Sequence, residues 1–281
     1  MIAATPAVPI PEAEVEVSKP VGIALGSNFE DPEKVEDLEL EWKLCAGAVP
    51  VMFLLAIGFH SFEIGHFLQR TWLTMPVHEM GHAVSAWFSG FAAMPTLWFT
   101  TVAEERGFGT AALLLGLLGF LVFRAWRAEN YVLVALGGAL IVVQGVCTLG
   151  IKAKTAEMLI VFGGDGVGMI LAAALMGSFF FGKGSDIYKG GLRWGFLAIG
   201  TAAFVDIFSL WFAARRDSGK IPFGEQEGRV QSDATRLVDD FDWTADQMVR
   251  RYVVLGAVCL VVVVALWIWG TWRAWKAASE K

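Results

Sequence analysis

The sequence is poor in cysteine, with Cys45, Cys147 and Cys259 as the three members of a 281-residue chain. An odd number of widely separated cysteines excludes a disulfide framework and gives no CxxC pair for a metal. Each cysteine falls within or at the edge of an apolar stretch, where we expect a small buried side chain. The sequence also shows no phosphate-binding loop, no cofactor motif, no peptide-docking domain and no internal repeat.

Charge is scarce as well, because Asp, Glu, Lys and Arg together make up 18% of the residues. The net charge of −6 comes largely from the N-terminal segment and from residues 214–251, which makes nucleic acid an unlikely class of partner. The first 40 residues are rich in Pro and Glu and lack the basic start and apolar core of a cleavable signal peptide. We predict a flexible acidic tail at 1–42 and a membrane domain at 43–281 with a hydrophilic, solvated insertion at 214–251.

Apolar residues are abundant, at 56% of the chain, with a mean hydropathy of +0.55. A membrane-spanning helix needs about 20 mostly apolar residues, so we searched for runs of that length between charges. Seven runs are candidates, of which the third is short and the second is polar: 44–61, 73–91, 108–123, 131–149, 157–181, 191–213 and 252–272. We therefore expect an all-α, polytopic bundle of about six or seven transmembrane helices, in the inner or plasma membrane if the chain is bacterial. The basic residues divide almost evenly between the two sides, which leaves the orientation open.

Two further local signals refine this picture. Residues 91–109 contain Pro95 and the β-favouring string Leu97 to Val102, which predicts a short β-hairpin or a re-entrant element. Thr244, followed three residues later by Gln247, has the form of a capping box. The last helix is thus expected to begin in water at residue 245.

The motif that carries chemistry is His78-Glu79-Met80-Gly81-His82. On a helix, HExxH places two imidazoles one turn apart on one face, where both can bind one zinc ion. Glu79 is offset by one residue, too far round to be a ligand beside them, but within reach of a water at the open metal position. This geometry suits a general base.

The surroundings of the motif support this interpretation. A polar stripe runs along an otherwise apolar helix at helical spacing, and it must face protein or water and not lipid. Its members are Thr74, His78, His82, Ser85 and Ser89. Pro76 stands two residues before His78, where a first-turn proline is tolerated, so the motif is expected near the start of its helix.

His78-Glu79-Met80-Gly81-His82-Ala83, within a multi-pass chain, resembles the active-site helix of the site-2 protease family of intramembrane zinc metallopeptidases. The resemblance implies cleavage of peptide bonds within or beside the membrane, with His78 and His82 as zinc ligands and Glu79 as catalytic base. In that family the third ligand is an aspartate in an Asp-Gly motif of a later transmembrane helix. Asp165-Gly166 is the matching pair in this sequence, although no Asn and Pro precede it as they do in the family pattern.

The sequence offers two named candidates for the third metal ligand, and a ligand elsewhere in the chain stays open as a further alternative. Gly164 and Gly168 form a small-xxx-small face that lets another helix come close to Asp165. Asp206, in the sixth apolar run, competes as a ligand or as a buried acid beside a ligating histidine. His60, Glu63 and His66 also precede the motif, but on a continuous helix their spacing turns His66 away from His60, and an interfacial or supporting role is expected.

Gln144 and Thr148, one turn apart in the fourth apolar run, are expected to form interhelical hydrogen bonds, with a contact to substrate backbone as the alternative. Together, these features predict a zinc metallopeptidase of the bilayer that acts on a membrane protein or peptide substrate. Two alternatives stay open. One is a non-proteolytic membrane scaffold or partner-binding protein that keeps the metal site, and the other is a metal or proton transporter that uses Asp165, Asp206 and the histidines.

Overall fold

The computed structural model describes residues 32–226 and 230–280 and is mostly helical. Its elements are, in chain order, α1 (Pro32–His60), α2 (Glu63–Gln69), η1 (Arg70–Thr74), α3 (Met75–Phe88), β1 (Phe91–Pro95), β2 (Thr100–Arg106), α4 (Phe108–Arg127), α5 (Tyr131–Gly145), η2 (Val146–Gly150), α6 (Ala153–Gly177), η3 (Ser178–Phe180), α7 (Asp186–Lys189), α8 (Leu192–Ala214), η4 (Ser218–Lys220), β3 (Glu225–Gln226), β4 (Val230–Gln231), α9 (Asp233–Asp239) and α10 (Ala245–Ser279). The turns η1 and η2 are π-helical, whereas η3 and η4 are short 3-10 helices.

Within the described residues, six helices are long and apolar enough to cross a bilayer. They cover Asp37–His60, Phe108–Arg127, Tyr131–Gly150, Ala153–Phe180, Leu192–Ala214 and Ala245–Ser279. The predicted helical, multi-pass integral membrane protein is confirmed. The run at 73–91 is not among these spans, because it is divided between η1, the 14-residue α3 and the start of the β-hairpin.

The core lies around α6 and α8, for which 56% of the most apolar 18-residue window is buried against protein. Helix α3 packs closely on α6 because glycines line the contact. A Cβ atom built on Gly164 would lie 2.6 Å from Nε2 of His82, and one built on Gly168 would lie 3.7 Å from Cα of His78. The predicted close approach of another helix to this small-residue face is confirmed.

Elements α2, η1 and α3 follow one another without leaving the helical conformation, since the residues at both junctions are right-handed helical. Pro76 lies in the first turn of α3, directly after the π-helical turn. In a regular α-helix its ring would clash with the carbonyl four residues earlier, and the wider π turn makes room for it. The HExxH helix therefore does not start at Pro76 but continues a helical path that begins at Glu63.

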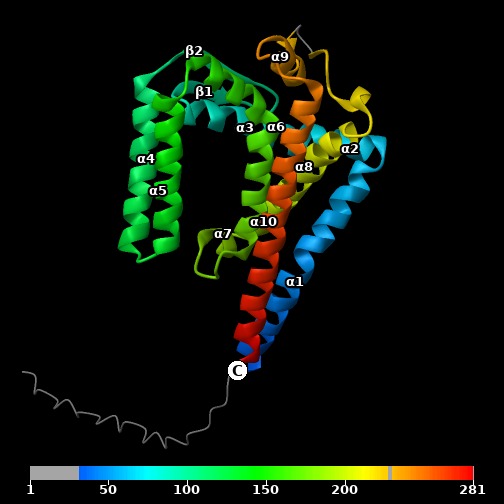
Figure 1. Ribbon diagram of the computed structural model, residues 1–281. Helices are drawn as coiled ribbons and strands as arrows, with labels where there is room; N and C mark the ends of the chain where they lie inside the picture. The colour runs from blue at the N-terminus through cyan, green and yellow to red at the C-terminus, as the bar shows by residue number, and fades with distance from the viewer. Residues whose placement is uncertain (1–31, 227–229, 281) are drawn as a thin grey trace, which may run out of the picture.

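Strands β1 and β2 pair antiparallel, with an irregularity between Phe91 and Ala93. The turn is held by Thr96, whose backbone N–H and side-chain hydroxyl donate to the carbonyl of Phe99 at 2.9 and 2.7 Å. The predicted hairpin is confirmed, with Leu97 to Phe99 in its turn and not in a strand. Figure 1 shows the hairpin at the upper end of the molecule, beside α3.

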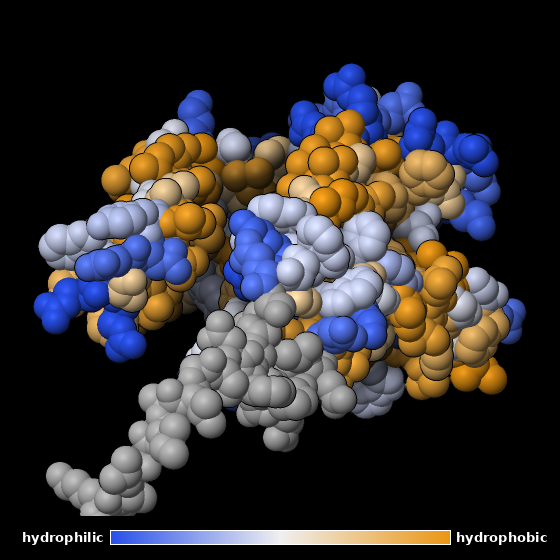
Figure 2. Space-filling view, turned by 90° about the horizontal axis from the view of Figure 1, so that it is seen from below, coloured by the Kyte–Doolittle hydropathy of each residue, from blue (hydrophilic) through white to orange (hydrophobic). Residues whose placement is uncertain are grey.

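Helices α4 and α5 lie side by side and apart from the main bundle in Figure 1. Only 6% of the apolar window of each is buried against protein. In the view from below, hydrophobic residues cover the flanks of the molecule and hydrophilic residues gather in separate groups (Figure 2). Gln144 of α5 donates to the carbonyl of Ala111 at 2.7 Å, and Thr148 donates to the carbonyl of Phe88 at 2.8 Å, which confirms the interhelical hydrogen bonds expected of both.

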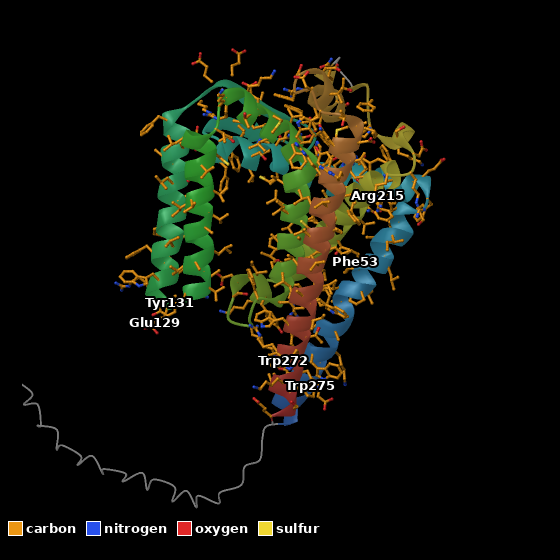
Figure 3. The ribbon with its side chains drawn as sticks, viewed as in Figure 1. Phe53, Glu129, Tyr131, Arg215, Trp272 and Trp275 are labelled. Carbon is orange, nitrogen blue, oxygen red and sulfur yellow. The ribbon has the colours of Figure 1, made fainter. Side chains whose placement is uncertain are left out.

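The hydrophilic insertion folds back over the upper end of the bundle, where Figure 1 shows α9. Its inner face is apolar, because Ala234, Leu237 and Trp243 are buried. Thr244 and Gln247 form the predicted capping box, and α10 begins at Ala245 as expected. In Figure 3, Arg215 lies near this upper end, whereas Trp272 and Trp275 mark the lower end of α10.

The remaining expectations concern the N-terminus and the cysteines. Residues 1–31 of the predicted tail lie outside the described residues, and α1 begins at Pro32. Cys45 and Cys259 are buried and Cys147 is half-buried, all three as free thiols.

Candidate metal centre

Helix α3 places His78 and His82 one turn apart, with ring centroids 4.7 Å apart and ring planes at 90°. Their Nε2 atoms lie 3.1 Å from each other. The whole predicted stripe faces protein: Thr74, His78, Ser85 and Ser89 are buried and the His82 side chain is 12% exposed. The polar face of this helix is thus directed away from lipid.

The outer ring nitrogens determine the tautomers of both histidines. Nδ1 of His82 lies 2.7 Å from the carbonyl of Ile160, and Nδ1 of His78 lies 2.8 Å from Oδ1 of Asp165. A carbonyl and a carboxylate can only accept, so both Nδ1 atoms carry the proton and donate it. In the neutral rings, each Nε2 then presents a lone pair, and the two lone pairs face each other with no hydrogen between them.

Asp233, the first residue of α9, supplies a third acceptor at the same point. Its Oδ2 lies 3.2 Å from Nε2 of His78 and 3.0 Å from Nε2 of His82. Burial is the largest influence on Asp233 and raises its pKa, but when His82 and His78 are protonated in the metal-free protein, their charge and hydrogen bonds lower it by more. The pKa of Asp233 therefore lies well below its usual value.

These three atoms fit the donor set of a transition metal. Tetrahedral coordination with bonds of about 2.0 to 2.2 Å places neighbouring donors roughly 3.4 Å apart. The separations of 3.0, 3.1 and 3.2 Å come close to this value. His78, His82 and Asp233 could therefore hold a metal ion between them.

Glu79 lines the same pocket, a space of about 140 Å³ that also contains Thr100, Gln231 and Arg236 in its walls. Its side chain is not among the converging donors. The hydroxyl of Thr100 donates to Oε2 of Glu79 at 2.8 Å and is also 2.9 Å from the Glu79 carbonyl. The hairpin thus fixes the orientation of the Glu79 carboxylate at the edge of the metal cluster.

The structure places the two predicted third ligands differently from Asp233. Asp165 contacts the outer nitrogen of His78, and its second oxygen accepts a hydrogen bond from Nε1 of Trp211 at 2.7 Å. This is the position of a carboxylate that orients a ligating histidine. Asp206 lies in a separate cluster with His60 and His66.

Sequence reasoning overlooked Asp233 because the insertion was interpreted as a solvated surface as a whole. One signal was present in the sequence: Ala234, Leu237, Val238 and Phe241 have the spacing of an amphipathic helix. That pattern indicates that the segment packs on something, although it does not say on what. Comparison of the chain with protein-family models, curated proteins and solved structures returned no match.

Proposed function

We propose that the protein is a membrane-embedded zinc metallopeptidase that hydrolyses peptide bonds in or beside the bilayer. The observation that carries the proposal is the convergence of three acceptors, Nε2 of His78, Nε2 of His82 and Oδ2 of Asp233, within 3.2 Å of one another. Three acceptors that face one another repel unless a proton or a metal cation lies between them. Imidazole and carboxylate donors in this number favour zinc.

His78, His82 and Asp233 would hold the zinc ion, which would supply a bound water of lowered pKa and polarise a scissile carbonyl. The chain itself supplies the base. Glu79, adjacent to His78 in sequence and lining the same pocket, takes the proton of the attacking water and returns it to the leaving amine. The hydrogen bond from Thr100 holds the carboxylate in place for both transfers.

Asp165 has a positioning role in this mechanism. Its carboxylate accepts from Nδ1 of His78, which fixes the ring and raises the basicity of Nε2. Trp211 in turn holds the second oxygen of Asp165. The three residues form a chain of hydrogen bonds from α8 through α6 to the HExxH helix.

The lining of the pocket suits an extended peptide. Trp98, Phe99 and Thr100 of the hairpin line one wall. A helical substrate has its backbone hydrogen bonds satisfied and must unwind before cleavage, and a strand edge offers replacement partners. The hairpin beside the pocket is the element that presents such an edge.

The test is Glu79→Gln in the full-length protein, purified in lipid nanodiscs and assayed for zinc content and for cleavage of a panel of transmembrane peptides. Removal of a general base lowers turnover by about 10² to 10⁴-fold, and we expect zinc binding to be retained. Glu105→Gln is the matched control, because Glu105 is an exposed residue of β2 outside the pocket. Undiminished cleavage by Glu79→Gln would exclude the mechanism, and a wild-type protein that holds zinc without cleaving any peptide would favour a scaffold function.

A further inference from the structure

The four histidines of the chain divide between two clusters, each with two histidines and one aspartate. The cluster away from the HExxH motif consists of His60, His66 and Asp206. We propose that this second cluster is an exchangeable site for a divalent transition metal. It does not depend on the proposed peptidase function, because it shares no residue with the first cluster.

A break in the helix brings the two histidines together. On a continuous helix, six residues separate two side chains by about 9 Å along the axis and by roughly 240° around it. Helix α1 instead ends at His60, Phe62 adopts an extended conformation, and α2 begins at Glu63. The imidazoles of His60 and His66 therefore lie 4.5 Å apart, and the expectation that their spacing separates them is wrong.

The turn requires a glycine at position 65. A Cβ atom built there would lie 2.6 Å from the ring of Phe62. The hydroxyl of Ser61 donates to the carbonyl of Ile57 at 2.6 Å and closes the end of α1. The local sequence thus builds a tight corner that places both imidazoles over α8.

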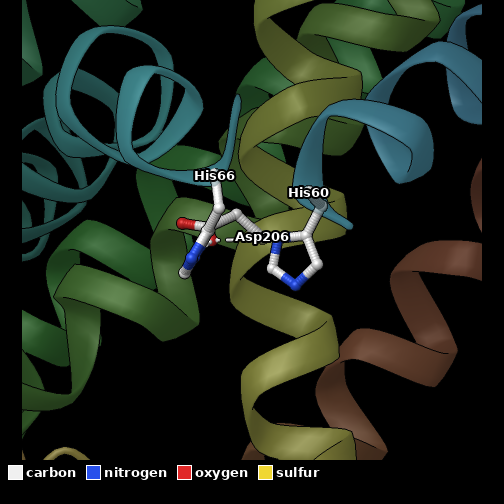
Figure 4. A group of neighbouring side chains, drawn as sticks. All are labelled: His60, His66 and Asp206. Atoms are coloured by element: carbon white, nitrogen blue, oxygen red, sulfur yellow. Dashed lines mark hydrogen bonds and ion pairs between the residues drawn. The ribbon is translucent and has the colours of Figure 1, made fainter. Parts of the chain in front are cut away.

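The imidazoles of His60 and His66 both approach the same carboxylate oxygen of Asp206 in α8 (Figure 4). Its Oδ1 lies 2.9 Å from Nε2 of His66 and 3.5 Å from Nδ1 of His60. The other oxygen, Oδ2, accepts a hydrogen bond from Nη1 of Arg70 at 3.1 Å. A carboxylate that binds a metal through one oxygen commonly has its second oxygen hydrogen-bonded in this way.

One atom of the cluster is poorly satisfied. Nδ1 of His60 is buried and forms no hydrogen bond with the described residues, because Oδ1 of Asp206, 3.5 Å away, is too far to accept one, and this is costly for a polar atom. A metal ion bound to Oδ1 of Asp206 and Nε2 of His66 would satisfy this nitrogen at the same time. The three donor atoms lie within 4.8 Å of one another.

The donor set and the charge determine which metal fits. Two imidazoles and one carboxylate suit Zn²⁺, Co²⁺ or Ni²⁺ and not Mg²⁺ or Ca²⁺. The adjoining space of about 490 Å³, lined also by Ser209 and Lys220, has room for water molecules that complete the coordination. Since Arg70 balances the charge of Asp206, the site is less negative than an unpaired carboxylate would make it, and we expect weak, reversible binding.

The chain's four histidines allow a clean test, because each cluster uses two of them. The probe is Co²⁺, titrated into the metal-free, full-length protein in lipid nanodiscs and followed by visible absorption and by equilibrium dialysis. We expect two equivalents for the wild type. His66→Gln should retain the tight equivalent and lose the weak one, and His82→Gln should do the reverse.

The His66 side chain is 47% exposed, so its replacement leaves the fold intact, and equal thermal midpoints of the metal-free proteins verify this. Loss of a residue that only hydrogen-bonds a metal ligand lowers metal affinity by roughly 10 to 100-fold. Loss of the ligand His66 itself should lower the Co²⁺ affinity of the weaker site by more than this. A Co²⁺ stoichiometry that is the same in the wild type and in His66→Gln would overturn the proposal, whether or not the first cluster binds Co²⁺. Arg70 and Lys220 make an anion the competing occupant, so binding of inorganic phosphate that depends on His66, without a second Co²⁺ equivalent, would overturn it as well.

Discussion

Replacement of Asp233 by Asn tests whether α9 supplies a metal ligand from outside the membrane helices. Asn keeps the size of the side chain and removes its charge. The substitution weakens the donor whose Oδ2 lies 3.0 and 3.2 Å from the two imidazole nitrogens. Asp165→Asn is the instructive comparison, because it leaves both Nε2 atoms in place, removes the negative charge beside Nδ1 of His78 and keeps one acceptor oxygen where His78 and Trp211 now use two.

The two variants differ in expected magnitude. Loss of an outer partner of a ligating histidine costs about 10 to 100-fold in metal affinity, or about 1.4 to 2.7 kcal/mol, and this is the expectation for Asp165→Asn. Loss of the anionic ligand itself should exceed that range in Asp233→Asn. Asp239→Asn is the control, since Asp239 is an exposed carboxylate of the same helix.

The assay is competition for zinc between each purified variant and a chromophoric chelator, at fixed pH and ionic strength. The expected order of affinity is wild type and Asp239→Asn, then Asp165→Asn, then Asp233→Asn. If Asp165→Asn binds zinc more weakly than Asp233→Asn, Asp165 is the ligand, as the resemblance to the site-2 protease family implies, and Asp233 only approaches the metal-free cluster.

Three more predictions follow from the packing. Gly164→Ala places a Cβ atom within 2.6 Å of the His82 imidazole, and this overpacking should cost about 1 to 3 kcal/mol of stability. We expect a lower thermal midpoint and a lower zinc affinity. Gly138→Ala is the control, because its Cβ atom meets no atom within 4 Å and should change neither quantity. Thr100→Val removes the donor to Glu79 and should slow peptide cleavage about tenfold, measured at full zinc occupancy, with unchanged zinc affinity. Arg193→Met removes two hydrogen bonds to a carboxylate of α1 and should destabilise the α1–α8 contact by about 3 kcal/mol, seen as a lower thermal midpoint.

The local rules of sequence predicted much of this structure. Apolar run length identified the spanning helices, and the capping box identified the start of α10. Helical spacing brought His78 and His82 to one face, and the glycines beside Asp165 predicted the close packing of α3 on α6. The sequence pattern behind each of these predictions lies within a few turns of the chain.

The features that the sequence did not predict depend on changes of chain direction and on contacts between residues that are far apart in the sequence. Asp233 reaches the imidazoles across more than 150 positions, and its own segment indicates only that one face is apolar. The corner at residues 61–62 was missed because no proline marks it, and continuous apolarity at the end of α1 suggested a straight helix. In both places the sequence identified the histidines as important, but it did not identify the side chains that lie beside them.

We expect the helix pair α4–α5, which lies apart from the main bundle, to make the position of α3 sensitive to membrane thickness. Each member spans 20 residues, about 30 Å, which matches an average hydrocarbon core almost without tilt. Because lipid surrounds nearly their whole surface, these two helices follow the bilayer when it thins or thickens. The hydrogen bond from Thr148 to the last residue of α3 transmits that displacement to the helix of His78 and His82. Lipids of different chain length should therefore alter the zinc affinity of an unchanged sequence.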